Sequence, residues 1–417
     1  MLRNYLLTAY KVFMRRKLFT AINLGCIVLT LVVLMVITAL LDTAFWPTGV
    51  EGKSDRMLQV YGMRSQRTDG QGRPTGMRTG LLGYKTIARY FKPMKSVERV
   101  AAITMTSEVS VYQGDRVSRL DLRRVDADYW KIMDFKLLAG RLPDAEDDRL
   151  GRMVAVVNAT SARQLFPEQA AVGQRISVEG QSFDIIGVVD DVIHVNAYAD
   201  IWAPLTTFPS TNYRDEVTGG LAALLLARSP ADLPRIRADV QLAAATIEPV
   251  GDQIFGKTTF WADSKLDLFA RNLLGRQSDA DSGAGRVLAM IAGGMLLFML
   301  LPALNLVNLN MGRIMERNAE IGVRKAFGAT SLQLAGQLVV ENVLLCLAGG
   351  LAGLACAQAV LWWLEASQLI PYLEVHINLK VFGWGMLIAF VFGLLSGAIP
   401  AWKMSRLDPV HALKGTA

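Results

Sequence analysis

Four long stretches without an acidic or basic side chain constrain this chain more than any other feature. They span residues 18–41, 287–312, 342–364 and 381–402. Each exceeds the roughly 20 apolar residues that a helix needs to cross a bilayer, and buried helices of soluble domains seldom run so long without a charge. The sequence therefore predicts a membrane protein with one span before, and three spans after, a large polar block at 42–286.

The distribution of Lys and Arg predicts the orientation, because basic residues near a span are retained in the cytoplasm. With the N-terminus inside, segments 1–17, 313–330 and 403–417 hold twelve basic residues, against six in the matching outside flanks. We therefore expect both termini in the cytoplasm, the polar block outside, and a short external loop at 365–380. The first span is expected to remain as an anchor, since no clear signal-peptide cleavage site follows it.

The composition fits this division and excludes several kinds of function. With 52% hydrophobic and 19% charged residues, the chain is too apolar to be a solely soluble protein. Its net charge of +7 is concentrated beside the spans, so nucleic-acid binding is not expected. The three histidines have no companion ligands, and no nucleotide-binding, zinc or nucleophile motif is present. We expect no enzyme activity, no metal and no cofactor on this chain.

The first 17 residues carry apolar side chains at helical spacing with cations between them. This pattern predicts a helix that lies in the cytoplasmic interface of the membrane, in contact with lipid. The alternative is a simple cytoplasmic extension of the first span.

Alternating apolar and polar residues predict strands in the polar block. Strands are expected at 99–112, 119–125, 154–157, 176–178, 183–189 and 221–227, and helices at 159–166 and 233–242. The interspersed pattern predicts an α+β domain of two subdomains, able to fold without a disulfide because all three cysteines lie in spans. Residues 63–83, rich in Gly, Arg, Thr and Ser, are predicted to form a mobile loop.

Several tracts together resemble one family. They are VDADYW at 125–130, LLAGR at 137–141, VAVVN at 154–158, ARQLF at 162–166, VGQRI at 172–176 and FDIIGVV at 183–189. These look like the periplasmic core domain of MacB-type ABC transporter permeases. In the second half, ERNAEIGVRKAFGA at 316–329 and GAIPAWKMSRLDPVHAL at 397–413 are similar to FtsX-like permease segments, with an FtsX-like domain at 287–409.

The resemblance implies the permease subunit of a bacterial cytoplasmic-membrane transporter. Its fold would be membrane α-helical, with four transmembrane helices and a large α+β extracytoplasmic domain. Such a subunit forms a homodimer or a heterodimer with a second permease and works with a cytoplasmic ABC ATP-binding subunit, which binds the ATP. ATP hydrolysis then moves the extracytoplasmic domain, an action called mechanotransmission, to export a drug, peptide or lipoprotein. A periplasmic adaptor is a further expected partner.

The cytoplasmic loop at 313–341 is predicted to couple this chain to the ATPase. Its mixed charges at helical spacing suit docking, and its glycines allow close backbone approach. The predicted coupling residues are Glu316, Arg317, Glu320, Gly322, Arg324, Lys325 and Gly328. An ordinary stop-transfer loop is the alternative.

Glu341 and the glycine pairs add expectations about the spans. We expect 331–340 to form a shallow approach helix, so that Glu341 lies at the membrane interface; a functional acid inside the span is the alternative. The spacings of Gly349 with Gly353, and of Gly393 with Gly397, predict close helix packing.

Two other functions remain compatible with the sequence. One is an FtsX-like signalling complex that regulates cell-wall hydrolases and transports no cargo. The other is a membrane-anchored sensor or adhesion domain without an ATPase, which would leave the loop at 313–330 without a purpose.

Overall fold

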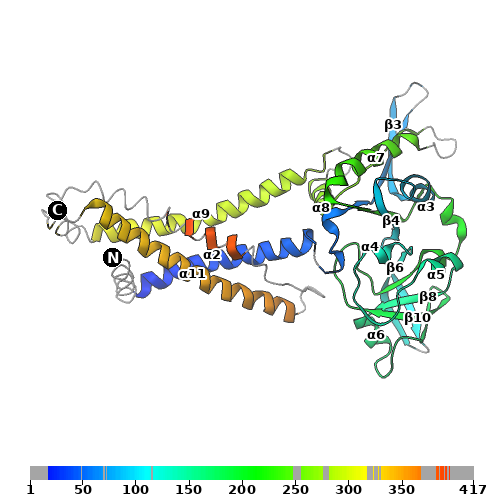
Figure 1. The fold of residues 1–417 in the computed structure, drawn as a ribbon, viewed down its shortest axis with the longest axis horizontal. Helices are drawn as coiled ribbons and strands as arrows, with labels where there is room; N and C mark the ends of the chain where they lie inside the picture. The colour runs from blue at the N-terminus through cyan, green and yellow to red at the C-terminus, as the bar shows by residue number, and fades with distance from the viewer. Residues whose placement is uncertain are drawn as a thin grey trace. The chain divides into compact units, whose positions relative to one another are not determined.

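The computed structural model describes residues 17–47, 49–68, 71, 73–113, 116–247, 255–275, 281–316, 323, 327, 330–367, 382–384, 386–388, 390, 391 and 394. Contacts divide the chain into two compact units (Figure 1). Met1–Asp42 and Arg286–Ala417 form the first, which we call the helical unit. Thr43–Gly285 forms the second, which we call the external domain.

Three long helices make up the described part of the helical unit. They are α2 (Lys17–Phe45), α9 (Ala284–Glu316) and α11 (Ser331–Ser367). Within the described residues, two runs are long and apolar enough to cross a bilayer, Thr20–Phe45 and Val339–Ser367, and α9 contributes the shorter apolar run Ala284–Leu300. The predicted first and third spans are thus helical. The predicted fourth span, the tail at 403–417 and the helix at 1–16 lie largely or wholly outside the described residues.

The described residues of the external domain contain fourteen strands. They are β1 (Met57–Val60), β2 (Met63–Thr68), β3 (Pro74–Leu82), β4 (Val97–Thr104), β5 (Ser107–Gln113), β6 (Arg116–Val125), β7 (Leu137–Gly140), β8 (Val154–Asn158), β9 (Arg175–Val178), β10 (Gln181–Val189), β11 (Ile201–Pro204), β12 (Thr218–Gly219), β13 (Leu221–Ala227) and β14 (Phe255–Phe260).

Its helices are short apart from two near the end of the domain. They are α3 (Tyr84–Thr86), continued by the π-helical turn η3 (Ile87–Phe91), then α4 (Tyr129–Ile132), α5 (Ala145–Leu150), α6 (Ala159–Leu165), α7 (Leu233–Thr246) and α8 (Lys265–Leu274). Short 3-10 turns occur at η1 (Gly49–Glu51), η2 (Ser54–Arg56), η4 (Leu205–Thr207), η5 (Thr211–Arg214) and η6 (Pro230–Asp232).

Six of the strands close on themselves. The pairings run β11–β8–β10–β9–β5–β6, and β6 then pairs in parallel with β11, which completes a small barrel. One hydrophobic cluster consists largely of residues from these strands, among them Val111, Leu122, Val157 and Phe183. Closure removes the exposed edges that an open sheet would present.

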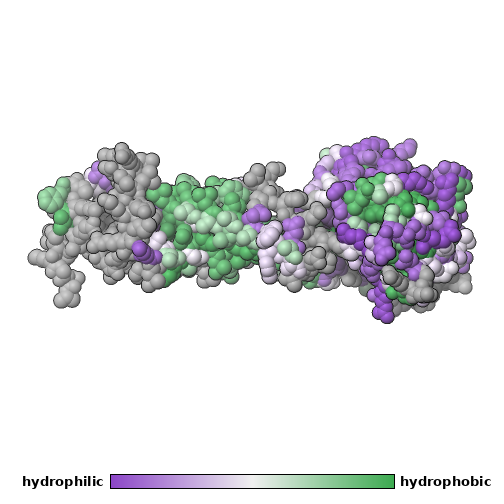
Figure 2. Space-filling model, turned by 90° about the horizontal axis from the view of Figure 1, so that it is seen from below, coloured by the Kyte–Doolittle hydropathy of each residue, from purple (hydrophilic) through white to green (hydrophobic). Residues whose placement is uncertain are grey.

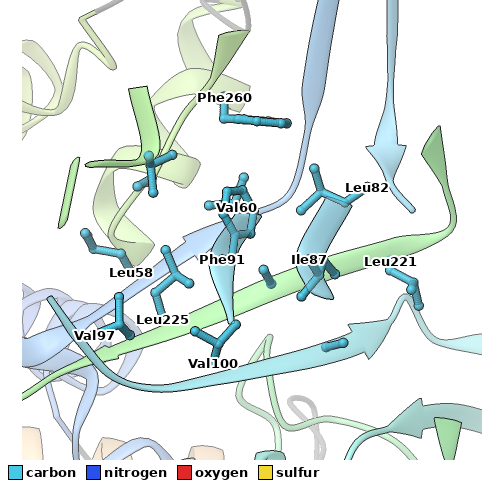
Figure 3. Packing of buried hydrophobic residues seen from close by; sticks show 14 of the residues in the cluster. Leu58, Val60, Leu82, Ile87, Phe91, Val97, Val100, Leu221, Leu225 and Phe260 are labelled. Atoms are coloured by element: carbon cyan, nitrogen blue, oxygen red, sulfur yellow. The ribbon is translucent and has the colours of Figure 1, made fainter. Parts of the chain in front are cut away.

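β7 pairs with β10 at the side of this barrel, and the other strands extend the sheet beyond it, with β13 at its centre. All seven residues of β13 are buried, and they alternate between two cores. Leu221 and Leu225 belong to a core that includes Phe91 and Phe260, whose rings lie 5.3 Å apart (Figure 3). Leu224 faces the other core, which contains α4. A central strand buried on both sides explains why its sequence, LAALLLA, is continuously apolar.

Most predicted elements are confirmed, and two are wrong. The strands at 119–125, 154–157, 176–178, 183–189 and 221–227 and the two helices are present. Within 63–83, predicted as a mobile loop, β2 and β3 instead pair with each other, and β2 also pairs with β14. The predicted strand at 99–112 is two strands, β4 and β5. Residues 331–340 are helical, as predicted, and form the first part of α11, which continues unbroken to Ser367; their shallow position in the membrane stays a prediction.

Candidate functional site

In the sequence, the predicted coupling residues lie between the start of α11 and the last residue of α9. Glu316 is the last residue of α9. Its side chain falls outside the described part of the chain, as do Arg317, Glu320, Gly322, Arg324, Lys325 and Gly328. The coupling role of these seven residues therefore stays a prediction.

Two apolar residues of the same loop are described, and both are exposed. Val323 is 43% and Phe327 88% exposed. The backbone N–H of Phe327 donates to the carbonyl of Val323 at 3.0 Å, so the two residues are one helical turn apart on the same face. Single exposed apolar side chains are common on protein surfaces, so exposure alone assigns no contact to Phe327, and a contact there is a prediction. Charges and glycines alone do not reveal this pair, whereas its i, i+4 apolar spacing within a charged segment does.

A cap separates this loop from α11. The Thr330 backbone N–H donates to the Gln333 side-chain oxygen at 3.0 Å, and the Gln333 backbone N–H donates to the Thr330 hydroxyl at 3.3 Å. This reciprocal pair is a capping box, which satisfies N–H groups that the first turn of a helix leaves open. It fixes the start of α11 at Ser331.

Helices α2 and α11 pack closely through two glycines. A Cβ atom added to Gly349 would lie 3.0 Å from the Cβ of Ile27, and one on Gly353 would lie 3.2 Å from the Cβ of Leu31. Both residue numbers increase together, so the two helices run parallel. The prediction of close packing at Gly349 and Gly353 is confirmed, while Gly393 and Gly397 lie outside the described residues.

Polar side chains are buried near the N-terminal ends of these two helices. Asn23 on α2 is fully buried, and Glu341 and Asn342 on α11 are 4% and 2% exposed. Glu341 precedes Trp362 on the same helix by about 32 Å of helical rise, close to the thickness of the hydrocarbon core. Trp362 and Trp363 are 67% and 57% exposed. Tryptophan favours the membrane interface, so this spacing predicts that Glu341 lies near the opposite interface, where its side chain is buried against protein.

The surfaces of the two units differ in polarity. In Figure 2 the described surface of the helical unit is mostly hydrophobic, whereas that of the external domain is mostly hydrophilic with one hydrophobic area on the face shown. This contrast is what a lipid-facing helical unit and a water-facing domain require.

The tracts at 125–130 and 137–141 serve the fold of the external domain. The Asp126 carboxylate accepts from the backbone N–H groups of Ala102 and Tyr129, and the Lys92 ammonium lies 2.9 Å away. Burial raises the pKa of Asp126. Arg141 donates twice to the fully buried Asp147 carboxylate, at 2.5 and 3.0 Å, and holds its pKa well below the usual range. These charges are occupied by structural partners.

A cleft of about 640 Å³ lies between α7, β14 and α8. Its charges pair with one another, Arg237 with Asp267 at 2.8 Å and Arg271 with Asp263 at 2.7 Å. Across the described ranges, no group of three or more His, Cys, Asp or Glu could hold a metal ion.

Comparison with known proteins gives a consistent match. A family profile for the MacB-like periplasmic core domain matches residues 20–243, and one for the FtsX-like permease C-terminal matches 292–409. The chain is 24% identical over 332 residues to YknZ of Bacillus subtilis (strain 168), described as an uncharacterized ABC transporter permease, covering 78% of this chain and 77% of YknZ.

A second relative is longer than this chain. The macrolide export ATP-binding/permease protein MacB of Vibrio parahaemolyticus is 21% identical over 327 residues, covering 77% of this chain and 47% of MacB. The chain thus spans about half the length of that relative. Among solved structures, the periplasmic region of MacB from Actinobacillus actinomycetemcomitans aligns with a TM-score of 0.38 at 15% identity, over 51% of this chain and 92% of that one.

Proposed function

Because this chain belongs to the permease family that combines a MacB-like periplasmic core domain with an FtsX-like C-terminal domain, we propose that it is the mechanotransmission subunit of an ABC transporter. Family membership makes it an ABC transporter permease of the bacterial inner membrane. In our proposal, a separate cytoplasmic ATPase binds and hydrolyses ATP, and the permease converts that work into movement of the external domain. The dimeric state and a periplasmic adaptor belong to the same proposal.

One observation carries this proposal. The external domain is inserted between two long apolar helices, since α2 ends at Phe45 and α9 begins at Ala284. Any change in the relative position of these helices acts on the domain at both of its chain connections. The close packing of α2 on α11 supports the same idea, because α11 begins directly after the segment that we propose contacts the ATPase.

The cargo is a substance extruded from the outer side of the membrane. The Vibrio relative is named for macrolide export, so a drug is one proposed class, with a peptide or lipoprotein as others. A cell-wall-regulating complex would keep the ATPase partner and move no cargo.

The first test is co-purification from membranes. We expect an ABC ATP-binding protein to copurify with the parent chain and to be lost from Phe327→Asp. Burying a Phe side chain contributes about 1.5–3 kcal/mol, so its loss should weaken binding roughly 10- to 100-fold. The matched control is Val117→Asp, a 57% exposed residue of β6, which should leave the ATPase bound. Absence of any ATPase in the parent sample would favour the sensor or adhesion class.

The second test concerns the predicted charge pair. Reversing the charge at Glu320 or at Arg324 should lower ATPase stimulation in lipid, and the double reversal should restore part of it. Exposed i, i+4 pairs contribute only about 0.2–0.5 kcal/mol, so contacts with the ATPase will limit the restoration. Both single variants behaving like the parent would return this loop to an ordinary stop-transfer signal.

A further inference from the structure

A buried ion pair joins the two ends of the external domain. The Glu51 carboxylate oxygen Oε2 lies 2.8 Å from the Lys265 ammonium, and the two side chains are 0% and 9% exposed. Glu51 closes η1, which follows α2, and Lys265 opens α8, which precedes α9. The pair therefore connects the segment by which the chain enters the domain with the segment by which it leaves.

The second oxygen of the same carboxylate binds the barrel side of the domain. Glu51 Oε1 accepts from the backbone N–H of Asn196 at 3.1 Å. Arg123 of β6 donates to the Asn196 carbonyl at 2.9 Å, and the Tyr61 hydroxyl donates to the Asn196 side-chain oxygen at 2.8 Å. One carboxylate thus contacts the entry segment, the exit segment and a loop held by a barrel strand.

Backbone contacts reinforce the same connection. Gln59 of β1 and Asp263 exchange two backbone hydrogen bonds, at 2.8 and 2.9 Å, and the Asp263 carboxylate is held by Arg271 of α8 at 2.7 Å. Two sets of contacts therefore join the entry and exit segments: the backbone hydrogen bonds between Gln59 and Asp263, and the ion pair between the side chains of Glu51 and Lys265.

Stability alone does not account for a pair buried this deeply. Removing two charges from water is expensive, and replacing a buried ion pair with neutral groups of similar size is often neutral or stabilising. Among the described residues, Glu51 Oε2 and Lys265 Nζ make no hydrogen bond, so their 2.8 Å contact is ionic, while the hydrogen bond from the Asn196 N–H fixes the orientation of the carboxylate. A joint that transmits movement needs that property.

We propose that Glu51, through Lys265 and Asn196, is the joint that makes the two membrane-connected segments and the barrel move as one body. The inference rests on the proposed function, since it assigns the residues through which movement of the helices reaches the distal part of the domain. Glu51 and Lys265 act here as positioning residues.

The test is ATP-dependent hydrogen exchange of the full permease with its ATPase in lipid nanodiscs, the ATPase carrying a substitution that blocks hydrolysis. The parent should show a change in exchange at residues 190–199 when ATP is added. Lys265→Met leaves the buried carboxylate without its partner, so both the unfolding temperature and the ATP response should fall.

The decisive variant is the double substitution Glu51→Gln with Lys265→Met. It keeps shape and the acceptor for Asn196 but removes both charges, so it should regain the parent's unfolding temperature while the ATP response at 190–199 stays below half. A merely structural pair would regain both, and that outcome would overturn the proposal. Lys265→Arg keeps the positive charge and should keep the ATP response at 190–199. Loss of the response in this variant would also contradict the proposal.

A matched control uses an exposed pair. Arg175→Gln breaks the Arg175–Asp184 contact, whose side chains are 70% and 54% exposed, and should change neither measurement. If the parent itself shows no ATP response in the external domain, the proposed function fails, and the inference fails with it. If the parent and the double variant respond equally, only the inference fails.

Discussion

The parallel packing of α2 on α11 can be tested by its register. Cysteines at Leu31 and Gly353 would have Cβ atoms about 3.2 Å apart, and cysteines at Ile27 and Gly349 about 3.0 Å apart. A disulfide requires a Cβ separation of about 3.5–4.5 Å, so a small outward shift suffices for both pairs. Pairing Leu31→Cys with Gly349→Cys instead displaces the partners by one turn, about 6 Å along the axis, which gives a separation near 7 Å.

We therefore expect the two matched pairs to oxidise and the displaced pair to remain reduced. The assay uses the full chain with Cys26, Cys346 and Cys356 replaced by Ala, oxidised in membranes and then treated with a maleimide polymer that adds mass to each free thiol. Matched pairs should resist labelling. Equal labelling of all three pairs, or closure of the displaced pair, would refute the parallel register.

This register has a topological consequence. If α2 and α11 cross the bilayer in the same direction, the chain must return once between them. Helix α9 is the long helix in that interval of the described chain, and its 33 residues exceed the length of a span. A parallel register therefore supports α9 as a third crossing, in agreement with the predicted second span.

Three further predictions concern the external domain. Gly140→Ala should destabilise the domain much more than Gly173→Ala, which thermal unfolding of the two variants will measure. Both glycines have a positive φ, which costs a residue with a side chain about 1–2 kcal/mol. Only at Gly140 does the added Cβ also collide with the Ile186 carbonyl. Arg141 holds the pKa of Asp147 below its unfolded value, so the stability that this pair contributes is present above about pH 4 and is lost as pH falls. Arg141→Met should therefore lower the free energy of unfolding at pH 7 by about 1–3 kcal/mol and make it depend less on pH in the acid range. Residues 47–270 alone should give a soluble product with cooperative unfolding, and aggregation of every such fragment would count against an independent core.

The sequence was most informative where local pattern decides structure. Uncharged runs located the long helices, and alternation located strands such as β9 and β10, whose two-residue turn is also local. The prediction at 63–83 was wrong because the β2–β3 hairpin depends on a partner strand, β14, that lies far away in the sequence. Ser65 of β2 contacts Thr258 of β14 at 3.2 Å across 193 positions of sequence, a pairing that polar, Gly-rich strands do not announce. Closure of the barrel through β6 and β11 is equally invisible to local pattern.

The difference between local pattern and contacts of distant segments also decides which parts of the proposed functional site could be predicted. The predicted coupling loop is one contiguous segment, so it could be proposed from its charges and glycines alone, and its role stays a prediction. The joint at Glu51 is assembled from three separate segments, since its contact with Asn196 spans 145 positions and Lys265 lies farther still along the chain. In the sequence, Glu51 is an ordinary acid beside a membrane span, and only burial to 0% exposure with a basic partner distinguishes it. Where a carboxylate is enclosed this completely yet lies at a chain connection, its geometric role is a better explanation than its contribution to stability.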